Sequence, residues 1–89
     1  MTKLEKDVEK PCCDWATRNG WLTYKFQSAN NRGVPDRIFI RNGQTVYVEF
    51  KRPNLQPSKL QEAVHKKMRE HGATVYVIDD IDTFKEVMA

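Results

Sequence analysis

The pattern of apolar and polar positions is helical near the start of the chain and alternates in its middle. Over residues 3–19 the apolar side chains lie three or four positions apart, as on one face of a helix; they are Leu4, Val8, Cys12 and Trp15. Gly20 suits the end of this helix, whereas Pro11 interrupts it, because proline removes a backbone hydrogen bond. We therefore predict a first helix that is either kinked at Pro11 or begins near it.

Three short segments in the middle of the chain predict strands: residues 21–26, 36–40 and 45–51. Asn42-Gly43 separates the last two and is the strongest short hairpin signal, because both residues tolerate positive φ. We therefore expect these two strands to pair antiparallel. The stretch between the first two strands is rich in asparagine, with one glycine and one proline, and predicts a loop.

The last third of the chain predicts a helix, a strand and a short helix. Ser58 is a suitable N-cap for a helix over 59–71, which Gly72 would end. Its apolar stripe would be Leu60, Val64 and Met68. Residues 74–78 form an apolar run typical of a buried strand, and 82–87 predict a final helical turn or two. The order α-β-β-β-α-β-α predicts the α/β class, with a mixed sheet flanked by helices.

The length and composition limit the organisation of the protein. Eighty-nine residues predict one domain over 1–89, and 39% hydrophobic with 10% aromatic residues is a globular composition. No apolar run approaches the roughly 18 residues needed to cross a bilayer, and the first residues lack the apolar segment of a secretory signal. We therefore expect no membrane association and a cytoplasmic location. Adjacent Cys12 and Cys13 do not resemble a disulfide framework, so buried thiols are expected.

Basic residues are concentrated in the middle of the chain. Between Asp14 and Glu62 there are only two acids, Asp36 and Glu49, among eight basic residues: Arg18, Lys25, Arg32, Arg37, Arg41, Lys51, Arg52 and Lys59. A basic stretch predicts a polyanionic partner, and nucleic acid is the commonest one. An acid inside a surface that attracts phosphates weakens binding unless it has a task, such as holding a cation.

The two isolated acids are predicted to meet at one end of the hairpin. Pairing brings Asp36, at the start of one strand, opposite Glu49 and Lys51, at the end of the other. Alternation places Glu49 and Lys51 on one face, with Val46, Val48 and Phe50 on the other face, toward a core. Two carboxylates can hold Mg²⁺, and a lysine beside them can orient water or offset phosphoryl charge. The alternative is a simple surface salt bridge.

These residues carry a resemblance to a known family. The segments Gly33-Val34-Pro35-Asp36 and Val48-Glu49-Phe50-Lys51, followed by Gln61 on the next helix, resemble the VRR-NUC branch of the PD-(D/E)xK nuclease superfamily. The resemblance implies a restriction-endonuclease-like αβββαβ core and dependence on Mg²⁺, with Mn²⁺ expected to substitute. It also implies that Asp36, Glu49 and the Phe50 backbone carbonyl are metal ligands, that Lys51 is catalytic and that Gln61 lies near the site.

The family also places an acid on the first helix, facing the site. Glu5 and Glu9 lie one turn apart on the same helix face. We favour Glu9 as this catalytic and metal-binding acid, because it precedes Gly20 by the spacing seen in related junction resolvases. The alternative for either residue is an exposed acid near the helix N-terminus.

The function implied is a metal-dependent, structure-specific endonuclease that hydrolyses DNA phosphodiester bonds. Phosphate contacts are expected from four residues that flank the site in sequence: Lys25, Arg32, Arg37 and Arg52. Bare cores of this superfamily often form homodimers and resolve four-way (Holliday) junctions in DNA repair and recombination. The interface is expected on the first helix or on residues 75–87. The alternatives are a non-catalytic nucleic-acid-binding module, a flap or general DNA nuclease, and a restriction-like enzyme.

Overall fold

The computed structural model describes residues 3–89, and its order of elements confirms the predicted one. The elements are α1 (Glu5–Arg18), β1 (Leu22–Lys25), β2 (Arg37–Arg41), β3 (Gln44–Phe50), α2 (Lys59–Glu70), β4 (Thr74–Ile78) and α3 (Ile81–Met88). The strand limits differ from the predicted ones by one residue at most ends, and β4 matches. Within residues 3–89, no helix is long and apolar enough to cross a bilayer.

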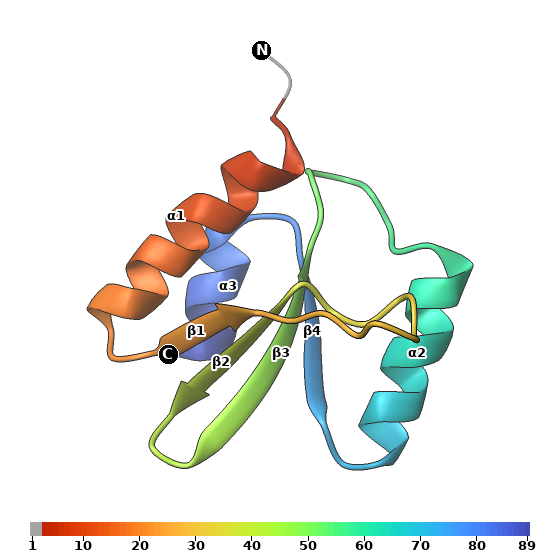
Figure 1. Ribbon diagram of the computed structural model, residues 1–89. Helices are drawn as coiled ribbons and strands as arrows, with labels where there is room; N and C mark the ends of the chain where they lie inside the picture. Colours follow the sequence, from red (N-terminus) through yellow and green to blue (C-terminus); the bar gives the residue numbers. More distant parts are fainter. Residues whose placement is uncertain (1–2) are drawn as a thin grey trace.

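The four strands form one mixed sheet in the order β1-β2-β3-β4. The pairs β1–β2 and β2–β3 are antiparallel, whereas β3 and β4 are parallel and α2 makes the crossover between them. Figure 1 shows α1 and α3 close together over one part of the sheet, with α2 beside β4 at its other side. The predicted α/β class and the mixed sheet flanked by helices are confirmed.

The core lies between the sheet and the pair α1 and α3. Its side chains are almost fully buried, and they include the predicted set Val46, Val48 and Phe50. The rings of Phe39 and Phe84 pack edge-on, with centroids 5.5 Å apart. Truncating either ring to alanine would cost about 3–5 kcal/mol of stability. Because Val48 and Phe50 face this core, alternation turns Glu49 to the opposite face of the sheet.

The first helix, α1, begins about two turns before Pro11. The helix is continuous from Glu5 to Arg18 with Pro11 in its interior, so the alternative in which it begins near Pro11 is wrong. The Leu4 amide donates to Asp7 Oδ2 at 2.8 Å, which satisfies one donor at the helix N-terminus. The turn that precedes Pro11 is therefore helical, and it places Glu5 at the first helical position.

The helix α2 packs differently from its predicted apolar stripe. Leu60 is half exposed, at 51%, whereas His65 is buried at 1%. The helix is therefore rotated about its axis relative to the orientation that the apolar stripe predicts. Because His65 and not Leu60 faces inward, α2 presents a polar residue to the interior and leaves apolar surface outside.

Candidate functional site

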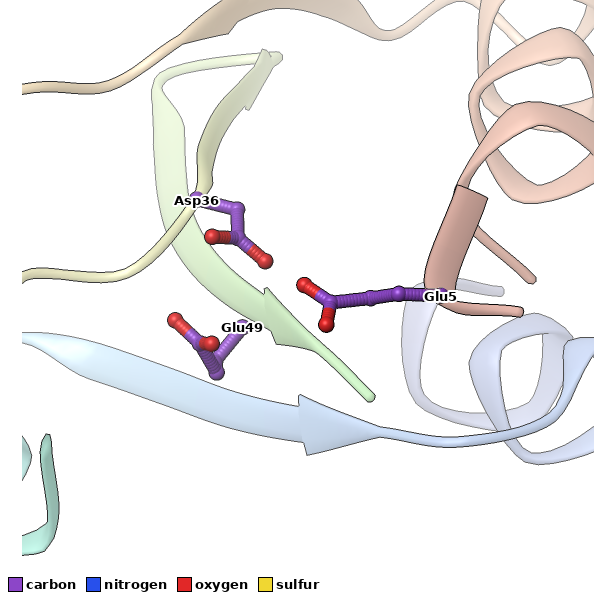
Figure 2. A group of neighbouring side chains, drawn as sticks. All are labelled: Glu5, Asp36 and Glu49. Atoms are coloured by element: carbon purple, nitrogen blue, oxygen red, sulfur yellow. The ribbon is translucent and has the colours of Figure 1, made fainter. Parts of the chain in front are cut away.

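Three carboxylates from three separate elements converge at one end of the sheet. Glu5 begins α1, Asp36 directly precedes β2, and Glu49 is the second-last residue of β3. One carboxylate oxygen of each lies within 4.8 Å of those of the other two. Figure 2 shows the three side chains pointing toward one another. This carboxylate cluster has the all-oxygen donor set that a hard divalent cation prefers.

The hairpin between β2 and β3 brings two of these carboxylates together. Its register pairs Arg37 with Val48, which places Asp36 opposite Glu49, as the sequence predicts. Asn42 and Gly43 both have positive φ, so the turn has the tight form that sets this register. Asp36 Oδ2 also accepts a hydrogen bond from the Phe50 amide at 2.8 Å, which fixes the carboxylate against the end of β3.

Glu49 is buried and only partly satisfied. Its side chain is 1% exposed, and Oε2 accepts from Gln61 Nε2 at 3.0 Å and lies 3.3 Å from Lys51 Nζ. Among residues 3–89, nothing donates a hydrogen bond to the other oxygen, Oε1, which is buried. A buried acceptor without a partner is costly, so this oxygen is suited to a cation ligand.

The pKa values of the three clustered carboxylates are raised. Burial, followed by the charge of Asp36, raises the pKa of Glu49 from 4.5 to about 7. Burial is also the first cause of the raised pKa of Glu5 and of Asp36. Three neighbouring carboxylates, of which Glu49 is buried, disfavour each other's ionisation, and a bound cation would reverse that effect.

The helix acid in this cluster is Glu5, and the prediction of Glu9 is corrected on this point. Glu9 lies one turn further along α1, where its Oε2 accepts from Arg37 Nε at 2.7 Å and lies 3.9 Å from Lys25 Nζ. Spacing from Gly20 selected the wrong turn, because α1 begins before Pro11 and its first residue points into the site. The contacts of Glu9 with Arg37 and Lys25 arise from the docking of α1 on the sheet, so no local sequence signal could have shown them.

The residues predicted to contact phosphates do not all lie together. Lys25 and Arg37 line a groove beside Glu9. Arg52 is exposed and lines a separate cleft of about 510 Å³ together with Glu5. Arg32 lies in the loop before β2 and lines other depressions. Lys25 and Arg37 therefore lie beside Glu9, and Arg52 lies beside Glu5 in a different cleft. Arg32 lies beside neither glutamate.

Sequence reasoning missed the close contact that holds the loop before Asp36. Gly33 has a φ of +88°, and a Cβ built there would lie 3.0 Å from Val64 Cγ2 and 3.1 Å from the Leu60 carbonyl oxygen. The neighbouring His65 is buried, and burial, then the charge of Arg69, lowers its pKa. The helix α2 thus packs directly on the backbone three residues before Asp36.

Known proteins match this chain in sequence and in structure. No protein-family model matches it. A phage protein from Acyrthosiphon pisum secondary endosymbiont phage 1, described as "Putative nuclease p44", is 35% identical over 79 residues, which cover 88% of this chain and 85% of the relative. A solved structure described as "VRR_NUC domain" is 27% identical and superposes with a TM-score of 0.87, covering 99% of this chain and 96% of that one. The chain therefore belongs to the VRR-NUC family.

Proposed function

We propose that this chain, as one domain over 1–89, is a metal-dependent endonuclease that hydrolyses DNA phosphodiester bonds. The observation that carries the proposal is the carboxylate cluster of Glu5, Asp36 and Glu49, with Lys51 beside it. The family membership and the relative named as a nuclease support the same reaction. A module that only binds nucleic acid would gain affinity by losing these acids, so their convergence disfavours that alternative.

The residues of the site fit a divalent cation. Glu5, Asp36 and Glu49 would hold Mg²⁺ with the Phe50 carbonyl as a further ligand, and Mn²⁺ would substitute. The fit rests on the oxygen donors and on the unpartnered buried Oε1 of Glu49. The ion would polarise a phosphoryl oxygen and lower the pKa of a bound water.

Lys51 and Gln61 have distinct proposed roles around Glu49. The Lys51 side chain is 14% exposed, and its ammonium lies at the edge of the cluster, where it can offset charge that develops on the phosphoryl group. Gln61 holds Glu49 from α2 and is itself held by Ser58, whose amide donates to Gln61 Oε1 at 2.9 Å. The N-terminal cap of α2 thereby orients a metal ligand, so Gln61 acts as a positioning residue.

We further propose that the protein acts as a homodimer on branched DNA, with the four-way junction as preferred substrate. A four-way junction has two-fold symmetry, and paired nicks require two sites at fixed spacing. Residues 75–87 are a poor choice for the interface, because Val75, Ile78 and Phe84 are buried within the chain. Exposed Leu22 and Tyr24 on β1 are better candidates, at 51% and 59% exposure.

One comparison of substrates tests this function. Purified protein is offered single-stranded, duplex, flap, forked and four-way-junction DNA with Mg²⁺, with Mn²⁺ and with a chelator. We expect metal-dependent cleavage, fastest on the junction, and none by the Asp36→Asn variant, which should still bind DNA. Binding without cleavage of any substrate would instead support the non-catalytic module, and equal cleavage of plain duplex would support a general nuclease.

A further inference from the structure

A basic groove adjoins the carboxylate cluster along α1. It has a volume of about 290 Å³ and is lined by four cations together with Glu9, Cys13 and Asp14; the cations are Lys6, Lys10, Lys25 and Arg37. The cations come from α1, β1 and β2, so the fold and not one helix assembles them. Four cations facing two carboxylates leave the groove positive, which suits an anion.

The Glu9 carboxylate contacts two of these cations, Arg37 and Lys25, and its single negative charge cannot neutralise both. Its Oε2 accepts from Arg37 Nε at 2.7 Å, and the side chains of Glu9 and Arg37 are only 16% and 20% exposed. Within residues 3–89 the Arg37 side chain donates this one hydrogen bond, through Nε. Its two terminal nitrogens are left for another acceptor, and a planar guanidinium suits phosphate oxygens.

The groove lies one turn along α1 from the cluster. Glu9 follows Glu5 by one helical turn, or about 5.4 Å, whereas Arg37 pairs with the core-facing Val48 and so lies on the other face of the sheet from Asp36. Successive phosphates of a strand are one nucleotide apart, a separation of that order. A strand whose scissile phosphate lies at the cluster would therefore place an adjoining phosphate at the groove.

We propose that this groove binds the phosphate next to the scissile phosphate through Arg37, with Glu9 as the positioning residue. This rests on the proposed nuclease function. Glu9 holds the guanidinium toward the groove and away from Asp36, the carboxylate next to it in sequence. Without that partner, the guanidinium would lose its fixed orientation in the groove, and the phosphate it binds would be held less precisely.

The phosphate contact is tested by binding, in the Glu49→Gln background, so that cleavage does not interfere. A single neutral methylphosphonate linkage is moved along the bound strand. We expect one position at which it weakens binding roughly tenfold, the scale of one charge-assisted hydrogen bond. Adding Arg37→Gln should reduce this penalty to less than twofold, and Arg37→Lys should retain part of it. Lys85→Gln, on an exposed lysine of α3, should leave the penalty intact.

The outcomes separate this inference from the proposed function. If no position loses its penalty in Arg37→Gln while wild-type protein cleaves DNA, the groove assignment is wrong and the nuclease stands. If the coupling is present but wild-type protein cleaves nothing, the phosphate site stands and the nuclease function fails.

The positioning role is tested by two substitutions at Glu9 in otherwise wild-type protein. Glu9→Gln keeps an oxygen that accepts from Arg37 Nε, whereas Glu9→Ala removes it. We expect Glu9→Ala to lower kcat at least tenfold, because Arg37 is no longer held in place. KM should not rise, because the groove becomes more positive. Glu9→Gln should recover most of the wild-type kcat. Equal kcat values for the two variants, or a weaker affinity of Glu9→Ala for DNA, would overturn the role.

Discussion

At the scale of single residues, Glu5 and Glu9 are distinguished by what each carboxylate faces. Glu5 lies in the carboxylate cluster, and Glu9 lies against Arg37 and Lys25. We expect Mg²⁺ or Mn²⁺ to raise the melting temperature of wild-type protein, and Glu5→Gln to remove most of that increase. Glu9→Gln is the matched control and should retain it. If Glu9→Gln instead loses the metal-induced increase in melting temperature and Glu5→Gln retains it, Glu9 is the metal-binding acid of the helix.

The raised pKa of Glu49 predicts a stability effect with a defined sign. Its pKa is about 7 in the folded protein and 4.5 in the unfolded chain, so between these values only the unfolded chain loses the proton. Stability from this group is thus full below pH 4.5 and is lost as pH rises to about 7. In metal-free protein, the stability of Glu49→Gln relative to wild type should increase by about 3 kcal/mol from pH 4.5 to pH 8. Denaturant unfolding at each pH measures the difference in unfolding free energy between the two proteins. A difference that does not change with pH would contradict the raised pKa of Glu49.

Lys51 is expected to act on the rate of cleavage and not on metal binding. Its ammonium lies 3.3 Å from Glu49 Oε2, at the edge of the cluster. Lys51→Ala should lower the single-turnover cleavage rate by roughly 10²–10⁴, the range for a positioned charge or proton-transfer group. The increase in melting temperature with Mg²⁺ should survive. Cleavage at the normal rate would reduce Lys51 to a salt-bridge partner.

At the scale of elements, α2 packs against the loop before β2, three residues before Asp36, and we expect this contact to position Asp36. A methyl group at Gly33 would meet the α2 backbone at 3.1 Å and would also sit at positive φ. We expect Gly33→Ala to cost about 1–3 kcal/mol of stability and to lower cleavage further than that loss explains, because Asp36 moves.

Gly43 provides the control for this substitution. Its φ of +78° is similarly restrictive, but a Cβ there meets nothing within 4 Å. Gly43→Ala should therefore lose stability through backbone strain alone and keep its cleavage rate when assayed well below its melting temperature. Equal losses of activity in the two variants would mean that the packing at Gly33 does not position the site.

At the scale of the whole molecule, the small core predicts a partner. An 89-residue domain buries a limited fraction of its surface, and Leu22 and Tyr24 remain half exposed on β1, an edge strand. We expect light scattering to give about twice the 10.4 kDa chain mass. Substituting Leu22 and Tyr24 with lysine should give a folded monomer that makes single instead of paired nicks on a four-way junction. A wild-type monomer at micromolar concentration would refute the dimer.

The sequence by itself determined the elements, the hairpin and the pairing of Asp36 with Glu49. These follow from local rules, because periodicity defines helices and strands, and the Asn42-Gly43 turn sets the register of β3 against β2. The resemblance to the VRR-NUC family rested on the same segments, and the comparisons agree with it.

Only the tertiary structure decided which residues of the helices reach the site. Glu5 and Glu9 share one helix face, so their choice depends on how α1 docks on the sheet, which no local pattern contains. The burial of His65 in place of Leu60 likewise depends on the rotation of α2. Local signals specify elements because backbone geometry is local, whereas docking is set by packing between residues distant in sequence.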